Sequence, residues 1–236
     1  MNIAQKTVLI TGANRGIGRA LVDEALKRGA KRVFAGTRTA LANADKRVTP
    51  LTLDVTNASH IQRAVDELGA LDVLVNNAGV CVFDDLSKPE ALEQHLAVNL
   101  FGTYNVTRAL LPLLKRSKGA IVNNLSLNAL APLPFQPAYG ISKAAALSLT
   151  QSLRTFLVGQ GVTVHGVLLG PIDTDMARDL KVPKASPASA AQAIFDGLEN
   201  AEEDIFPDPW SQSIAEGWRT GVAKGLEREL ARLALQ

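Results

Sequence analysis

Short apolar runs alternate with longer amphipathic stretches along most of the chain. The apolar runs have strand character and cover Thr7–Ile10, Arg32–Gly36, Leu51–Val55, Leu71–Gly79, Gly119–Leu125, Val162–Gly170 and the short Asp204–Phe206. Helical spacing occupies Arg15–Arg28, Ile61–Leu68, Pro89–Arg116, Ala138–Gly159 and a segment capped by Ser186 that extends to Asn200. Strands alternating with long helices pair in parallel through right-handed crossovers. The pattern therefore predicts an α/β fold: a doubly wound, Rossmann-type, mostly parallel sheet of about seven strands with helices on both faces.

The end of the chain carries a different pattern. Apolar residues recur every fourth position at Trp210, Ile214, Trp218, Val222, Leu226 and Leu230, beside a row of glycines at 217, 221 and 225. We expect one domain over residues 1–236, with 207–236 as a helical extension that packs closely on another helix. That helix belongs either to a second subunit or to the same domain, and the glycines indicate a close approach or a kinked, partly irregular segment.

The composition argues against a nucleic-acid-binding, a membrane-spanning or a secreted protein. The 236 residues include 25 basic and 23 acidic side chains, mixed along the chain, which favours neither a nucleic acid nor a charged partner. The uncharged stretch 119–142 contains three prolines and is not expected to span a membrane. The sequence MNIAQK is unlike a signal peptide, and a lone cysteine, Cys81, suits a reducing compartment, so we expect a cytoplasmic protein.

The stretch TGANRGIG, residues 11–18, follows the first strand and opens the first helix. A strand, a glycine turn and a helix N-terminus form the geometry that binds phosphate, because backbone N–H groups face the ligand and bare glycines let it approach. Gly12, Gly16 and Gly18 would serve this purpose. The alternative is a tight turn without a ligand.

Two arginines refine this hypothesis. The second strand ends in Thr37-Arg38, where such folds often place an acid for the adenosine ribose. A guanidinium there would instead attract a 2′-phosphate, and Arg15 in the glycine loop could contact the same group. The alternative is that both are solvated surface arginines.

A catalytic constellation is predicted at the carboxyl edge of the sheet. Tyr139 and Lys143 are four residues apart at the start of a helix and so share one face. A nearby ammonium lowers the pKa of a phenol and makes it a usable acid or base. Ser126 follows the fifth strand and would meet the same ligand. A tyrosine and lysine at this spacing usually mark only a solvated helix face.

The motifs jointly resemble those of the short-chain dehydrogenases/reductases of the shorter, single-domain type. They are TGANRGIG, LDVT at 53–56, NNAG at 76–79, Asn99, Ser126, Tyr139 with Lys143, and GPIDT at 170–174. The resemblance covers residues 5–206.

The resemblance implies a role for each matching residue. Tyr139 would protonate the carbonyl oxygen, Ser126 would orient it, and Lys143 would bind the nicotinamide ribose and lower the pKa of Tyr139. Asn99 would hold a water that resupplies the proton. The residues implied to contact the cofactor are Gly12, Asn14, Arg15, Gly16, Ile17, Gly18, Arg38, Asp54, Val55, Asn76, Ala78, Gly79, Tyr139, Lys143, Pro171, Ile172 and Thr174.

Some residues depart from the pattern or carry no predicted chemistry. Asn124 stands in NNLS, where the family more often has paired serines, and the stretch 38–51 leaves room only for a truncated helix. The histidines at 60, 95 and 165 lack metal spacing, so no metal site is expected. Cys81 is expected to be a small buried hydrophobe, and the acidic pairs 84/85 and 173/175 to be solvated or capping groups.

These observations predict an NADP(H)-dependent oxidoreductase that interconverts a ketone or aldehyde and an alcohol. Two alternatives stay open: an NADP-binding regulator or scaffold without activity, and a dehydratase or epimerase with no net change in cofactor. Candidate substrate segments are 80–83, 127–135 and 176–182, with Met176 and Leu180 in a closing loop. They are mostly apolar, which favours a neutral, hydrophobic carbonyl compound. The resemblance also implies a homodimer or homotetramer.

Overall fold

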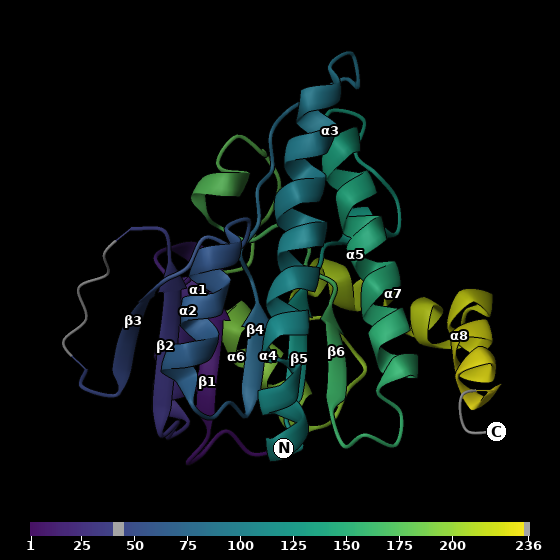
Figure 1. The fold of residues 1–236 in the computed structure, drawn as a ribbon. Coiled ribbons are helices and arrows are strands. Elements are labelled where there is room, and N and C mark those ends of the chain that lie inside the picture. Colours follow the sequence, from purple (N-terminus) through teal and green to yellow (C-terminus); the bar gives the residue numbers. More distant parts are fainter. Residues whose placement is uncertain (40–44, 234–236) are drawn as a thin grey trace.

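Parallel strands form the centre of the molecule. The computed structural model describes residues 1–39 and 45–233, and within these residues seven strands form one sheet in the order β3-β2-β1-β4-β5-β6-β7 (Figure 1). The strands are β1 Thr7–Thr11, β2 Arg32–Thr37, β3 Val48–Thr52, β4 Val73–Asn76, β5 Ala120–Asn124, β6 Thr163–Val167 and β7 Asp204–Ile205. Every neighbouring pair is parallel. The predicted doubly wound fold is confirmed.

Helices cover both faces of the sheet. They are α1 Gly16–Lys27, α2 Ala58–Leu68, α3 Pro89–His95, α4 Thr103–Ser117, α5 Pro137–Phe156 and α6 Pro187–Glu199. Side chains of α1 and α6 share one core cluster with the strands. Those of α2 and α4 share a second cluster, on the other face. The order in which strands are added to the sheet reverses between β1 and β4, and this is the switch point where open α/β sheets bind ligands.

Two predicted elements differ from the structure. The third strand was expected over Leu51–Val55 but spans Val48–Thr52, because its register pairs Val33 with Val48 and Thr37 with Thr52. Leu53 and Val55 are buried beyond the strand end. The N–H of Leu53 still donates to the carbonyl oxygen of Thr37, but the regular pairing with β2 ends at Thr52. The expected helix Pro89–Arg116 contains a π-helical stretch, η1 Leu96–Gly102, between α3 and α4. Residues 40–44, part of the stretch where a truncated helix was expected, lie outside the described residues.

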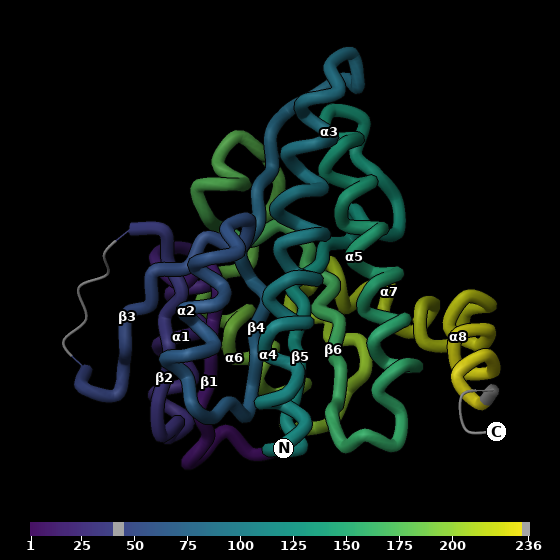
Figure 2. The backbone as a smooth tube through the Cα atoms, viewed as in Figure 1, coloured from purple at the N-terminus to yellow at the C-terminus, as the bar shows by residue number. Residues whose placement is uncertain are grey.

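The C-terminal segment is two helices, so the prediction of one helix is wrong. α7 Pro209–Thr220 and α8 Val222–Leu233 are separated at Gly221, whose ψ of 159° is extended. The break at Gly221 agrees with the kinked, partly irregular segment that the glycine row predicted as one alternative. Figure 2 follows the chain from β1 to these helices, which lie beyond β6 at the edge of the sheet opposite β3. Val222, Leu226 and Leu230 are exposed along α8.

Candidate active site

A cavity of about 750 Å³ opens at the carboxyl ends of the central strands. One end is formed by the glycine loop, Thr37, Arg38, Asp54 and Val55, and the other by apolar side chains of the later loops and α7. Between them lie Ala78, Gly79, Ser126, Tyr139 and Lys143. The cavity therefore joins the predicted phosphate site to the predicted catalytic residues.

The glycine loop is shaped by positions that a side chain cannot occupy. Gly12 and Gly16 have φ values of 66° and 53°, in the left-handed region that favours glycine. A Cβ on Gly18 would lie 2.1 Å from the carbonyl oxygen of Gly12, and one on Gly12 would lie 2.9 Å from Cα of Ala78. The loop thus brings bare backbone and the N-terminus of α1 to the cavity, which suits a pyrophosphate.

Asn77, the second residue of the NNAG motif, holds this loop in place. Its Nδ2 donates to the carbonyl oxygens of Thr11, at 2.9 Å, and Gly12, at 3.2 Å. The hydroxyl of Thr11 accepts from the backbone N–H groups of Asn77 and Ala78. The ends of β1 and β4 are thereby fixed to one another. The signal was present in NNAG, whose second asparagine follows the strand directly.

The two arginines lie at the glycine-loop end of the cavity. Arg38 is exposed, and it contributes to a lowered pKa of Asp54, a shift caused mainly by hydrogen bonds from Thr56. Arg15 donates to Asp175 across the cavity at 2.9 Å, between side chains that are both more than half exposed. An exposed pair of this kind is screened by solvent and contributes little to stability, so Arg15 can exchange Asp175 for a phosphate at little cost.

Ser126, Tyr139 and Lys143 converge on the middle of the cavity. Ser126 follows β5 and caps the short 3₁₀ turn Leu127–Ala129. Tyr139 and Lys143 lie on the first turns of α5, and Nζ of Lys143 is 5.7 Å from the centre of the Tyr139 ring. Nζ of Lys143 donates to the carbonyl oxygen of Asn124 at 2.7 Å. The fold thus brings together the hydroxyl, phenol and ammonium that the sequence predicted.

Burial governs the protonation of these groups. It raises the pKa of Tyr139, against a hydrogen bond from Ser126 that lowers it. It lowers the pKa of Lys143 to about 8. The expectation that Lys143 lowers the pKa of Tyr139 is not met in this geometry, because the ammonium is directed at the Asn124 carbonyl. Tyr139 is held as a neutral phenol, the form that can donate a proton.

Asn99 lies behind the cavity, within η1. Its Oδ1 accepts from Val80 N at 2.9 Å, and its Nδ2 donates to Val80 O at 3.0 Å and to Ser142 Oγ at 2.9 Å. The side chain therefore fixes the loop after Gly79 to the start of α5, next to Lys143. It is 2 % exposed and does not form part of the cavity wall.

The comparisons with known proteins agree with this geometry. Residues 6–184 match the family described as short chain dehydrogenase. The chain belongs to the short-chain dehydrogenase family. A short-chain dehydrogenase from Burkholderia cenocepacia, solved in complex with NADP, is 36% identical, with a TM-score of 0.89 over 98% of this chain and 99% of that one.

Two curated relatives extend the similarity. The 11-beta-hydroxysteroid dehydrogenase-like 3 of Arabidopsis thaliana is 33% identical over 89% of this chain and 75% of its own length. The ketoacyl reductase HetN of Nostoc sp. is 32% identical over 89% of this chain and 81% of its own length.

In this short-chain dehydrogenase, one predicted cofactor residue faces elsewhere. Nδ2 of Asn76 donates to Thr107 at 2.9 Å and to Asn123 at 2.8 Å, beneath the sheet and away from the cavity. The other residues predicted to contact the cofactor all line the cavity. Asn76 points away because side chains alternate along a strand, so its neighbour Asn77 faces the ligand side.

Asn124, which departs from the family pattern, joins the two halves of the short-chain dehydrogenase site. Its Nδ2 donates to Oδ1 of Asn77 at 2.8 Å, while its backbone oxygen accepts from Lys143. Its own Oδ1 is buried and has no hydrogen-bond partner among the residues that the structure describes. A single residue thus connects Asn77, which holds the glycine loop, to Lys143.

The remaining end of the cavity is apolar. Leu127, Leu130, Leu133, Met176 and Leu180, from two of the predicted substrate segments, line it, and so do Trp210 and Ile214, which were not predicted there. Trp210 and Ile214 belong to the C-terminal stripe, whose spacing predicted packing on another helix. Cys81 also lines the cavity, and burial raises the pKa of its thiol to about 11, so it is protonated at neutral pH.

The three histidines and Asp84 of the short-chain dehydrogenase have structural partners. His60, His95 and His165 each bond to a backbone group, and Asp84 accepts from Ala138 N at the start of α5. Among the described residues, no group of three or more His, Cys, Asp or Glu side chains is arranged to hold a metal ion. Within residues 1–39 and 45–233, no helix has the length and apolar character to cross a bilayer.

Proposed function

We propose that the protein is an NADP(H)-dependent oxidoreductase that interconverts a ketone or aldehyde and an alcohol. The observation that carries the proposal is the convergence of Ser126, Tyr139 and Lys143 on a cavity whose far end is the glycine loop. The glycine loop fits a pyrophosphate because Gly12 and Gly18 leave no room for a Cβ. When bound, the dinucleotide supplies or accepts the hydride.

The chain's own residues supply orientation and a proton. In the direction of reduction, Tyr139 donates its phenolic proton to the carbonyl oxygen, which becomes the alcohol, and Ser126 holds that oxygen by a hydrogen bond. Lys143 lies beside the phenol and supports its return to the neutral form, while Asn99 holds the Val80 loop against α5. The reverse direction takes the proton from the alcohol to Tyr139.

Preference for NADP(H) rests on Arg15 and Arg38. Both line the glycine-loop end of the cavity, where a 2′-phosphate would lie, and no carboxylate occupies the position of Thr37 or Arg38 to repel it. The Burkholderia cenocepacia relative holds NADP. This supports the same cofactor here.

The substrate end supports a neutral, hydrophobic carbonyl compound. Leucines, Met176, Trp210 and Ile214 form its wall, and no arginine or lysine other than Lys143 lies among the residues that line this end. A carboxylate substrate would therefore lack a charged partner. The relatives named for hydroxysteroids and ketoacyl compounds are consistent with a substrate that has a large apolar part. The single cysteine fits a reducing cytoplasm as the place of action.

The proposal is tested by incubating the protein with NADPH and a panel of ketones and aldehydes and following the loss of NADPH absorbance. Tyr139→Phe removes the proton donor and keeps the ring, so the rate should fall by about 10²–10⁴-fold while the Kd of NADPH stays within about twofold. A variant that retains more than about a tenth of the wild-type rate would remove Tyr139 from the mechanism. If wild type binds NADPH but oxidises it with none of the ketones or aldehydes in the panel, the result would favour a regulator, a dehydratase or an epimerase.

A further inference from the structure

Helix α7 is attached to the rest of the molecule at both of its ends. One of its faces forms part of the wall at the apolar end of the cavity, where the substrate is proposed to bind. Trp210, Ile214 and Trp218 lie four residues apart and so share one face of the helix. The first two line the cavity, and the third leaves it to reach β7. The position of α7 therefore sets the width of the apolar end of the cavity.

The first attachment is Asp208, the N-cap of α7. Its buried carboxylate accepts from Ser211 N at 3.0 Å and from Gly170 N at 2.8 Å. A Cβ on Gly170 would lie 2.4 Å from Oδ1 of Asp208. Gly170 directly precedes Pro171 and Ile172, so Asp208 fixes the start of α7 to the loop that closes the nicotinamide end of the cavity.

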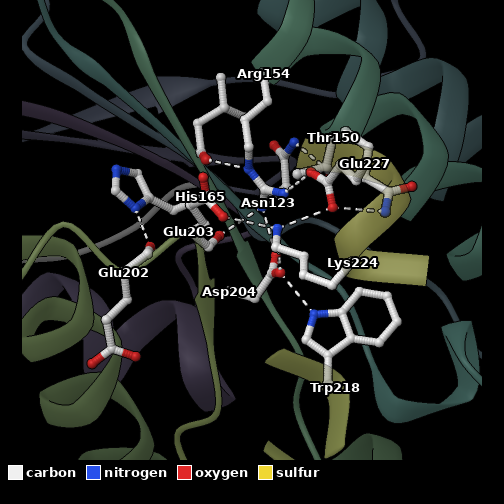
Figure 3. A network of polar contacts seen from close by, with 12 residues as sticks. Asn123, Thr150, Arg154, His165, Glu202, Glu203, Asp204, Trp218, Lys224 and Glu227 are labelled. Carbon is white, nitrogen blue, oxygen red and sulfur yellow. Dashed lines mark hydrogen bonds and ion pairs between the residues drawn. The ribbon is translucent and has the colours of Figure 1, made fainter. Parts of the chain in front are cut away.

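The second attachment is an ionic cluster around Asp204 on β7, shown in Figure 3. Nε1 of Trp218 donates to Oδ2 of Asp204 at 2.7 Å. The same carboxylate pairs with Lys224 at 2.9 Å and with Arg154 at 2.6 Å. Asp204 and Lys224 have side chains only 2 % exposed, which makes this a buried anchor.

The cluster also fixes α8 to the rest of the molecule. Glu227 of α8 pairs with Lys224 at 3.0 Å and with Arg154 of α5, and it accepts from Gln151 at 3.0 Å. Arg154 in turn donates to the backbone oxygen of Val164 on β6. Because α8 follows α7 after the break at Gly221, an anchored α8 also prevents the end of α7 from moving outward.

We infer that the Asp204–Lys224–Glu227–Arg154 cluster, acting through Trp218, is a specificity-determining device that positions α7 against the substrate. This rests on the proposed function, since it concerns the substrate end of the same cavity. Trp218 and Lys224 are positioning residues: neither lines the cavity, and both act on Trp210 and Ile214 through the helix. Loss of the cluster should therefore impair binding of bulky apolar carbonyl compounds and leave the proton chemistry and the dinucleotide site unchanged.

Two variants and a matched control test the inference. Trp218→Phe removes only the indole N–H and keeps an aromatic ring, and Lys224→Met removes the buried ammonium at similar length. Arg219→Gln, on the same helix, breaks the exposed pair with Glu202 and leaves the cluster intact. Thermal unfolding confirms that each variant is folded, and hydrogen–deuterium exchange of residues 209–220 reports on α7.

The binding probe is 2-acetylnaphthalene, with NADP⁺ present so that no turnover occurs. Its Kd, measured by calorimetry, should rise about tenfold in Trp218→Phe and Lys224→Met, with faster exchange in α7, and stay unchanged in Arg219→Gln. In turnover with NADPH, the KM of the same ketone should rise while kcat and the KM of acetone stay within about twofold of wild type. The Kd of NADP⁺ should not change.

The outcomes separate this inference from the proposed function. Wild type that binds the probe but never reduces it would contradict the proposed function and leave the device in place. Wild type that does not bind the probe would overturn the inference, as would variants whose α7 exchange rises while the Kd of the probe stays constant. Equal losses for 2-acetylnaphthalene and acetone would also overturn it, because they would show a general structural effect.

Discussion

At the scale of the residue, Lys143 carries a buried ammonium, whose charge lowers the stability of the folded protein. Burial lowers its pKa in the folded protein to about 8, from 10.5 in the unfolded chain. At neutral pH folding buries a charge, which lowers the free energy of unfolding. This loss of stability disappears as the pH rises from about 8 toward 10.5, because the folded protein releases the proton before the unfolded chain does. At about 1.4 kcal/mol per pKa unit, the cost is on the order of 3 kcal/mol.

We predict that wild type gains stability relative to Lys143→Met as the pH is raised. The gain should be on the order of 2–3 kcal/mol between neutral pH and pH 10.5, because only wild type has the buried amine to deprotonate. The measurement is urea unfolding of both proteins, free of nucleotide, across this range. Comparing the two proteins cancels the titration of the other lysines. A constant difference in stability would show that the ammonium is solvated.

Arg38 is predicted to select the cofactor. A hydrogen bond to a charged group is worth about 1.5–3 kcal/mol, so Arg38→Ala should weaken NADPH about 10–100-fold. NADH, which lacks the 2′-phosphate, should be little affected. Adding Thr37→Asp should repel the phosphate and move the preference toward NADH, as measured by kcat/KM for both cofactors. Arg63→Ala, exposed on α2 and outside the cavity wall, is the matched control. If Arg38→Ala lowered kcat/KM equally for NADPH and NADH, Arg38 would not recognise the 2′-phosphate and the site would bind either dinucleotide.

At the scale of the element, the π-helical stretch η1 places Asn99 where its amide bonds both the N–H and the oxygen of Val80. Asn99→Ala should lower the free energy of unfolding by about 1–3 kcal/mol, because the buried partners lose hydrogen bonds. Urea unfolding is the measurement. Gln62→Ala is the control, since the amide of Gln62 bonds only the exposed Asp66 on α2. Equal effects of the two variants would contradict a structural role for the η1 amide.

The elements show which parts of the fold a sequence can predict. β1, β5 and α5 agree with their predicted positions within a few residues, because their burial and their periodicity have the same cause. Leu53 and Val55 misled the prediction of β3, since they are buried just beyond Thr52, the last residue of the strand. The π-helical stretch η1 could not be predicted from the spacing of apolar residues, because one extra residue in a helical turn shifts the apolar stripe only slightly.

The site likewise contains residues that the sequence could place and residues that it could not. Ser126, Tyr139 and Lys143 meet as expected because strand ends and a helix start share one edge of a parallel sheet. Asn77 and Asn124 needed knowledge of which face of the strand each occupies. Trp210 and Ile214 needed the path of the chain after β7. Their apolar spacing is equally compatible with a cavity wall and with helix packing, and only the tertiary structure distinguishes the two.

For the whole molecule, we predict a homodimer or homotetramer that uses the outer face of α8. Val222, Leu226 and Leu230 form an exposed apolar row, and Val222 is 90% exposed. Light scattering at micromolar concentration should give the mass of two or four chains. Val222→Glu with Leu226→Glu should reduce this mass, because two carboxylates would be buried in the contact.

Leu86→Glu is the control for this prediction, since Leu86 is also exposed but lies in the loop before α3. It should leave the mass unchanged. A monomeric wild type would contradict an assembly altogether. A double variant of unchanged mass would instead place the contact on another face.

The attachment of α7 at two points that lie outside the proton chemistry has an evolutionary consequence. Trp210 and Ile214 come from the last stretch of the chain, whereas Ser126, Tyr139 and the glycine loop come from earlier ones. Under the proposed function, mutations of Trp210 and Ile214 would therefore change which substrates fit and would leave the residues that transfer the proton in place. A descendant lineage could acquire a new substrate by exchanging its final segment, provided that Asp204 and Asp208 still receive it.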